Sequence, residues 1–198
     1  MKSEERKLQI IQETLAIIGE SGLQGLTVSK IASNAGITEA ALYRHFKNKE
    51  DILLQVVEFI GIRLTTTLNS VKDKMMKSLD KLSEIFFIHT EHIQKNHGIP
   101  RIIYTSEVHV NEKLRVALYK IIDTYLAIVG FIIEAGIKNN ELQPDINATA
   151  ESMRFLAMIQ FTAFRYSLSG FQKKTIMESQ FIWNSYANSI KLETNLSS

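Results

Sequence analysis

The chain has 198 residues, a formal net charge of +2, 45% hydrophobic residues and 22% charged residues. These values are ordinary for a soluble globular protein, and the length suits one large or two small domains. The lack of cysteine excludes disulfides and thiolate metal sites, so nothing indicates secretion. So small a net charge does not indicate a nucleic-acid partner by itself, and only a local cluster of positive charge would.

The N-terminal sequence is charged and leads directly into an amphipathic pattern, which argues against a signal peptide. The longest uncharged apolar run, residues 125–133, is much shorter than the roughly 20 residues that cross a bilayer. We therefore expect a cytoplasmic protein that has no membrane partner.

Residues 3–18 have the pattern of an amphipathic helix. Ser3 can cap its N-terminus, and Glu4 and Glu5 fall in the first turn, where the helix dipole favours negative charge. Apolar residues recur along one face at spacings of three and four: Leu8, Ile11, Leu15 and Ile18. We expect the glycine-containing segment 19–25 to end this helix, and the next two helices to cover its apolar face.

Residues 27–46 predict two short helices joined by a tight turn. Thr27 can cap the first helix, and Thr38 can cap the second, with Glu39 in its first turn. Between them Gly36 can adopt the positive φ that a sharp corner needs. This is the outline of a helix-turn-helix, whose second helix normally enters the major groove of DNA.

The second of these helices has two different faces. Leu42 and Phe46 share one face and can be buried, whereas Ala40 and Arg44 lie on the other. Arg44 can make a bidentate hydrogen bond to a guanine edge, and the adjacent Tyr43 can donate its hydroxyl to a phosphate. The alternative without a DNA-binding function is a generic three-helix bundle that exposes a tyrosine and an arginine on its surface.

A fourth helix is expected over residues 48–64. Asn48 can cap it, with Glu50 and Asp51 in the first turn. It begins beside the expected DNA-binding face and is the only element that we expect to contact both halves of the molecule. Residues 65–77 have a loose pattern that is typical of a helix end and a turn.

The remaining chain is helical in pattern. The expected helices cover residues 79–94, 101–107, 112–138, 147–168 and 173–191. The first of them places these residues on one side: Leu82, Ile85, Phe86, His89 and Ile93. Gly98 and Pro100 punctuate the chain before the second. Because the alternation typical of strands does not persist anywhere, we predict an all-α fold of about nine helices.

The sequence also resembles the N-terminal domain of TetR-family transcriptional regulators. The matching segments are GLTV at 25–28, IA at 31–32, AGIT at 35–38 and LYRHFKNK at 42–49. The resemblance covers residues 8–57, and beyond them the chain matches only in length and helical pattern. It implies a helix-turn-helix DNA-binding domain at 1–49 and a helical effector-binding and dimerisation domain at 50–198.

The same resemblance implies roles in DNA binding. Residues at or near phosphate-contacting positions are Thr27, Tyr43, His45 and Lys49. Residues that face base edges or backbone are Ser29, Ala40, Ala41 and Arg44, and Thr38 completes the set as the cap of the reading helix. Because the two alanines offer no hydrogen bonds, base recognition must rest on Arg44, apolar contacts and DNA shape.

The last two helices predict a homodimer. One stripe at helical spacing contains Ile176, Ser179, Trp183, Tyr186 and Ile190. Phe181 and Ile182 form a second apolar face off this stripe. Because a chain can bury only one stripe of a terminal helix, we expect a second copy to pack on these helices, with Phe155 and Ile159 of the preceding one. A two-fold dimer places two reading helices about 34–36 Å apart. The resemblance also implies a four-helix interface, and the alternative is a thick internal core.

A small-molecule effector is implied by the resemblance, more than by any single residue. Polar groups interrupt otherwise apolar stretches, as in a ligand pocket, but each alone fits a satisfied core or surface position better than a ligand contact. The expected effector-binding residues are Phe86, His89, Ile103, Tyr104, Ile122, Tyr125, Met158 and Phe161. We expect a mainly apolar effector with one or two polar handles.

Several histidines raise the possibility of a metal site, but their pattern argues against one. His89 and His92 can share a helix face, but no thiolate or carboxylate completes a standard ligand set. The sequence contains neither a glycine-rich phosphate loop nor a nucleophile elbow. We therefore expect no metal, no cofactor and no enzymatic activity. A metal-dependent sensor or enzyme is kept as an alternative hypothesis.

Taken together, the sequence predicts a dimeric TetR-type regulator. We expect a repressor that binds double-stranded DNA at a palindromic operator and is released by a small effector. The alternative is a DNA-binding regulator or architectural protein without a small-molecule effector, controlled by a protein partner.

Overall fold

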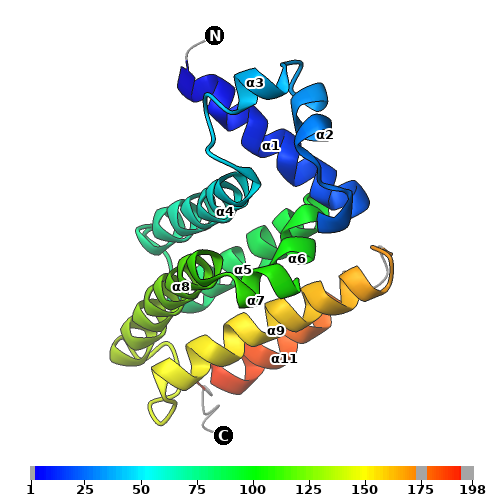
Figure 1. Cartoon of the computed structure of the whole chain (residues 1–198). Coiled ribbons are helices and arrows are strands. Elements are labelled where there is room, and N and C mark those ends of the chain that lie inside the picture. The colour runs from blue at the N-terminus through cyan, green and yellow to red at the C-terminus, as the bar shows by residue number, and fades with distance from the viewer. Residues whose placement is uncertain (1–2, 173–177, 193–198) are drawn as a thin grey trace, which may run out of the picture. The chain divides into compact units, whose positions relative to one another are not determined.

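A computed structural model describes residues 3–172 and 178–192 (Figure 1). Within these residues the chain forms α-helices and one short 3-10 helix, and an isolated bridge between Leu142 and Lys191 is the only β-type pairing. The predicted all-α fold is confirmed.

The helices follow one another with short connections. They are α1 (Ser3–Ser21), η1 (Leu23–Gly25), α2 (Val28–Asn34), α3 (Glu39–Leu42), α4 (Lys49–Lys72), α5 (Ser78–Lys95), α6 (Gly98–Ile103), α7 (Ser106–Val110), α8 (Glu112–Lys138), α9 (Ala148–Leu168) and α11 (Ser179–Ile190). The long helices α8 and α9 agree with the prediction to within one residue.

The chain divides into two compact units. The first unit comprises residues up to Arg63 together with Lys95–Ile121, and the second comprises Leu64–Gln94 and the residues from Ile122 onward. The expected boundary after residue 49 does not coincide with this division, because the first part of α4 and residues 95–121 join the helix-turn-helix in one unit. Both α4 and α8 contribute residues to each unit, so α4 is not the only such element.

The core of the first unit combines α1–α4 with α6, α7 and the start of α8. Its buried residues include Ile18, Leu42, Phe46, Ile52 and Ile102. At Gly98 the chain passes so close to α1 that a Cβ there would lie 2.3 Å from the carbonyl oxygen of Leu15. A glycine is therefore required for α6 to lie against α1.

The region after α5 differs from the prediction of one helix at 101–107. Gly98 and Pro100, expected as punctuation, lie in the first turn of α6, and a second short helix, α7, follows. Proline is tolerated there because the first amides of a helix have no acceptor within the helix.

The helix α4 is longer than predicted. Residues 65–72, expected to leave the helix, continue it to Lys72. Leu68 and Val71 in this extension are buried in the core of the second unit. Burial of this face outweighs the weak helix propensity of three consecutive threonines, residues 65–67.

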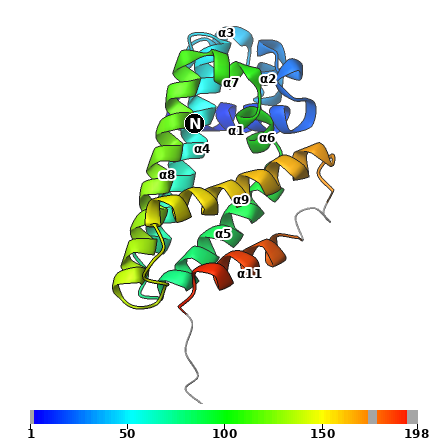
Figure 2. The same cartoon turned by 90° about the horizontal axis from the view of Figure 1, so that it is seen from below.

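The second unit is built from α5, α8, α9, α11 and the end of α4. Figure 2 shows α5, α9 and α11 running alongside one another. Aromatic side chains from these three helices contact one another in the core. The ring centroid of Trp183 lies 5.6 Å from that of Phe86 and 6.5 Å from that of Phe155. The predicted apolar side of α5 is buried as expected.

Among the described helices, α8 is the one long and apolar enough to cross a membrane. Core helices of soluble proteins share these properties, and in the second unit Val129, Ile132 and Ile133 of α8 are buried in the core.

Candidate nucleic-acid interface and regulatory surfaces

Two threonine caps and one glycine corner form the helix-turn-helix. The hydroxyl of Thr27 accepts a hydrogen bond from the backbone N–H of Lys30 at 3.1 Å, and the hydroxyl of Thr38 accepts one from that of Ala41 at 3.2 Å. Gly36 has a φ of +65°. The predicted caps and the predicted corner are thus confirmed, and each acts where a helix end lacks internal partners.

The reading helix is shorter than its pattern indicates. Regular α-helix ends at Leu42, and the chain continues in a tighter turn in which the N–H of Arg44 donates to Ala41 at 3.2 Å and that of His45 to Leu42 at 2.9 Å. Arg44 and Tyr43 are therefore presented from this turn, just beyond α3.

The side chains divide as the two-face pattern requires. Leu42 and Phe46 are buried, whereas Ala40, Tyr43 and Arg44 are exposed. Of the other residues chosen for DNA binding, those that are exposed are Thr27, Ser29 and Thr38, and those that are half-buried are Ala41, His45 and Lys49. The structure brings them together on α2, α3, the turn after it and the start of α4 (Figure 1).

Two side-chain hydrogen bonds, similar to those of a capping box, fix the start of α4. The side-chain oxygen Oδ1 of Asn48 accepts from the N–H of Asp51 at 2.8 Å, and the carboxylate of Asp51 accepts from the N–H of Lys47 at 2.9 Å. The cap was predicted, whereas the return bond from Asp51 was missed although the Asn-x-x-Asp spacing is visible in the sequence. The backbone of the basic segment 47–49 is thereby held in place.

The residues chosen for an effector site do not form one set. Phe86, His89 and Tyr125 lie together in the core of the second unit, and Ile122 and Met158 pack against that core. Phe161 is 63% exposed, so it lies outside this core. Ile103 and Tyr104 belong to the first unit.

His89 and Tyr125 form a neutral polar pair among apolar side chains. Nδ1 of His89 lies 3.3 Å from the hydroxyl of Tyr125. Burial, with a smaller contribution from His92, lowers the pKa of His89 to about 4, and burial raises the pKa of Tyr125 well above its ordinary value. Both groups are therefore uncharged at neutral pH, and each can donate or accept a hydrogen bond.

The residues chosen for dimerisation are mostly buried within their own chain. Their side chains face the core of the second unit: Phe155, Ile159, Ser179, Trp183, Tyr186 and Ile190. Ile176 lies outside the described residues. The assignment of these residues to a dimer interface is therefore corrected, because the chain buries this stripe in its own core. The exposed apolar residues of α9 and α11 are Met153, Phe161, Phe164, Leu168 and Phe181, which we call the outer face.

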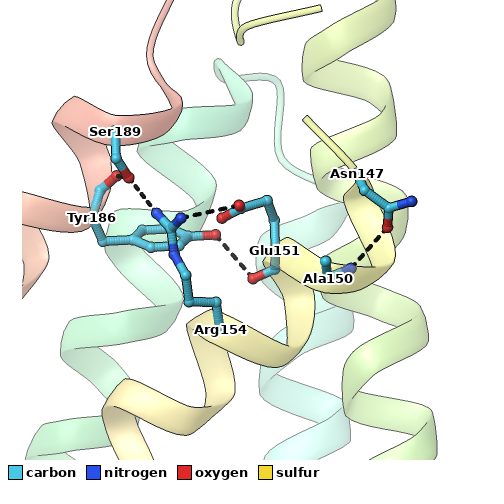
Figure 3. A network of polar contacts seen from close by, with 6 residues as sticks. All are labelled: Asn147, Ala150, Glu151, Arg154, Tyr186 and Ser189. Atoms are coloured by element: carbon cyan, nitrogen blue, oxygen red, sulfur yellow. Dashed lines mark hydrogen bonds and ion pairs between the residues drawn. The ribbon is translucent and has the colours of Figure 1, made fainter. Parts of the chain in front are cut away.

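A polar network joins α9 to α11 beside this outer face (Figure 3). The hydroxyl of Tyr186 donates to the carbonyl oxygen of Glu151 at 3.2 Å, and Arg154 donates to the Glu151 carboxylate at 3.1 Å and to the Ser189 hydroxyl. The Arg154 guanidinium lies 4.9 Å from the centre of the Tyr186 ring. Burial, followed by the Glu151 charge, raises the pKa of Tyr186, so its hydroxyl stays protonated and can donate.

Two open grooves accompany these surfaces. One of about 840 Å³ in the first unit is lined by residues of α4, α7 and α8, including Lys49, Glu50 and Asn111. The other, of about 600 Å³, lies between α9 and α11 and includes Met158 and Phe181. Within the described residues, no group of three or more His, Asp or Glu side chains is placed to hold a metal ion.

Comparisons with known sequences converge on one family. Residues 10–56 match the model of bacterial regulatory proteins of the tetR family. A fatty acid metabolism regulator protein of Bacillus subtilis is 30% identical over 141 residues, which are 71% of this chain and 72% of that protein. A nucleoid occlusion factor SlmA of Idiomarina loihiensis is 33% identical over 98 residues, so this chain matches half of its length.

Solved structures share the fold. The transcriptional regulator FadR from Bacillus subtilis in complex with stearoyl-CoA has a TM-score of 0.80 and 22% identity, covering 92% of this chain and 98% of that one. A TetR transcription regulator from Haloarcula marismortui has a TM-score of 0.84 and 17% identity, covering 95% and 99%.

Proposed function

Because this chain belongs to the TetR family of bacterial regulatory proteins, we propose that it is a repressor that binds a palindromic operator as a homodimer and is released by a small, largely apolar effector. The observation that carries the proposal is the exposed segment formed by α3 and the turn after it, which we call the reading segment. Tyr43 and Arg44 project from that turn. The family is one of DNA-binding transcription regulators, so the cytoplasm is its expected place.

The proposed DNA contacts separate into two kinds. Arg44 reads a guanine edge, and Ala40 approaches base edges closely, where its methyl group can touch a thymine methyl. Tyr43 and Lys49 contact phosphates, which fix the position of the protein without reading sequence. The capped start of α4 supports this assignment, since it holds Lys49 next to the reading segment.

The proposed dimer forms through the outer face. Phe161 and Phe181 are 63% and 77% exposed, and apolar side chains gathered on two neighbouring helices favour burial against a copy of the same surface. The network of Arg154 and Tyr186 supports this role, because it braces α9 against α11 and so keeps the surface in one shape.

The proposed effector has a long apolar part and a polar group. Two similarities support this proposal. The sequence is similar to that of the fatty acid metabolism regulator, and the fold is similar to that of a regulator bound to stearoyl-CoA. The chemistry of the second unit is compatible, because His89 and Tyr125 offer neutral hydrogen-bonding groups among apolar side chains. A long-chain acyl thioester of coenzyme A is therefore the first effector to test.

The likeness to a nucleoid occlusion factor favours a second candidate, a DNA-binding regulator controlled by a protein partner rather than a small molecule. One experiment separates the two. A duplex is selected from random DNA with the purified protein, and its binding is followed by fluorescence anisotropy with stearoyl-CoA, free coenzyme A or stearate added. Release by stearoyl-CoA alone supports the effector proposal. Unchanged binding at saturating stearoyl-CoA contradicts the acyl-thioester proposal and favours the second candidate. Absence of any selected duplex would contradict the repressor proposal altogether.

A further inference from the structure

Asn111 lies between α7 and α8 and uses its backbone at both helix ends. Its N–H donates to the carbonyl of Glu107 at 2.9 Å, which closes α7, and its carbonyl accepts from the N–H of Arg115 at 2.9 Å. Its side-chain Oδ1 caps α8 by accepting from the N–H groups of Lys113 and Leu114 at 3.0 and 3.1 Å. One polar group then remains, the side-chain amide nitrogen.

That nitrogen, Nδ2, donates a hydrogen bond to the carboxylate of Glu50 in the first turn of α4. Glu50 directly follows Lys49, and the carboxylate of Asp51 after it accepts from the N–H of Lys47. The first turn of α4 is therefore held from two sides, by the cap at Asn48 and by Asn111.

The packing below this bond brings the same two helices together. Leu53, one turn after Glu50, and Leu114, one turn after Asn111, are both buried in the core of the first unit. Further along, a Cβ at Gly61 of α4 would lie 2.5 Å from the Ile121 side chain of α8. The bond from Asn111 thus completes a packed pair of helices at their N-terminal ends.

We propose that Asn111 is a positioning residue for DNA binding, which fixes the first turn of α4, and with it Lys49, to the start of α8. The proposal rests on the proposed contact of Lys49 with a phosphate. The bond lies at an exposed site, but a bond to a charged carboxylate still restricts the first turn more than a neutral bond would. Without it, Lys49 must be ordered when DNA binds, which lowers affinity.

Three variants test the hydrogen bond from Asn111 to Glu50, which we call the tie. Asn111→Asp keeps the capping oxygen, because Asp and Asn are equivalent caps, but places a second carboxylate against Glu50. Glu50→Gln removes that carboxylate. The double variant has the net charge of the natural protein and restores a donor–acceptor pair with its direction reversed, from Gln at 50 to Asp at 111. Asn147→Asp is the matched control, since it makes the same change at the cap of α9, where Oδ1 accepts from the N–H of Ala150 at 2.9 Å.

The readout is anisotropy with the selected duplex, at one fixed salt concentration. We expect Asn111→Asp to weaken binding about tenfold, the double variant to recover most of that loss, and Asn147→Asp to bind within about twofold of the natural protein. Equal binding by Asn111→Asp and the natural protein would overturn the proposal. So would a double variant as weak as Asn111→Asp, because the loss would then come from something other than the tie.

Hydrogen exchange without DNA keeps this test separate from the proposed function. Amides in the first two turns of α4 should exchange about tenfold faster in Asn111→Asp than in the natural protein, and at the natural rate in the double variant. Thermal melts of all four variants establish that they are folded. Faster exchange with no DNA binding by any form would show that the tie exists and that the proposed function is wrong. Unchanged exchange would show that the tie itself is wrong.

Discussion

At the scale of single residues, Arg44 and Lys49 have different proposed tasks. Arg44→Ala should relax the preference at one base position, at a cost of about 1–3 kcal/mol against the preferred sequence, because a bidentate bond to guanine is lost. Lys49→Ala should weaken binding to all sequences alike, because a phosphate contact carries no sequence information. Selection from random duplexes, compared for the two variants, measures both effects. An unchanged preferred sequence for Arg44→Ala would show that another residue reads the base.

The pH dependence of stability should reveal the buried His89. Its pKa is lowered from 6.5 to about 4 in the folded protein, so the unfolded chain binds the additional proton between these values. Stability is therefore fully present above pH 6.5 and should fall by up to about 3 kcal/mol as the pH drops toward 4. Urea unfolding at several pH values measures this slope. His89→Gln should flatten it, and an equal slope in both proteins would place the titration elsewhere.

The sequence predicted what single residues do locally better than what they face. The caps Thr27, Thr38 and Asn48 were correct because a cap depends on bonds within three residues. The exposure of Phe161 was not predicted, because it depends on which helices pack against α9, and spacing alone does not determine that. The side-chain bond from Asn111 was missed for the same reason, since Glu50 is 61 residues away.

At the scale of helices, the close approach of α6 to α1 should make Gly98 sensitive. Gly98→Ala would place a Cβ 2.3 Å from a backbone oxygen, which cannot move aside as a side chain can. We expect a loss of about 1–3 kcal/mol in the free energy of unfolding, measured in urea. Gly130→Ala is the control, because no heavy atom lies within 4 Å of its Cβ position and the helical α8 should gain about 0.5–1 kcal/mol. Equal stability of the two variants would mean that α6 is free to shift.

The existence of most helices could be read from the sequence, but some of their ends could not. The extension of α4 to Lys72 passes through three threonines, and only the burial of Leu68 and Val71 accounts for it. The split between α6 and α7 likewise escapes periodicity, because each helix is too short to show a face.

At the scale of the whole molecule, the oligomeric state tests the proposed role of the outer face. Replacing Phe161 and Phe181 together by serine should shift the protein from dimer to monomer in sedimentation experiments, because each loses an exposed apolar surface. Operator affinity should fall with it, since two linked half-sites bind far more tightly than one. Tyr119→Ser is the matched control, an exposed aromatic residue of α8 outside the outer face. An unaltered dimer in the double variant would direct the search to another surface.

The sequence only partly predicted the proposed dimer surface. It predicted two apolar faces on the last helix and assigned Trp183, Tyr186 and Ile190 to the partner. Amphipathic spacing describes both faces but not which of them the chain buries. In the structure the larger side chains complete the core of the second unit, and Phe181 remains outside.

The short reading segment also bears on how such a regulator can diverge. Ala40 is exposed and Ala41 half-buried, while Leu42 and Phe46 hold the segment in the core. A new side chain at the exposed Ala40 would therefore change the proposed DNA-contacting surface without disturbing the packing below. If Ala40 approaches base edges as proposed, duplicated copies of the gene could acquire separate operators by changes at this position while inheriting the same folded scaffold.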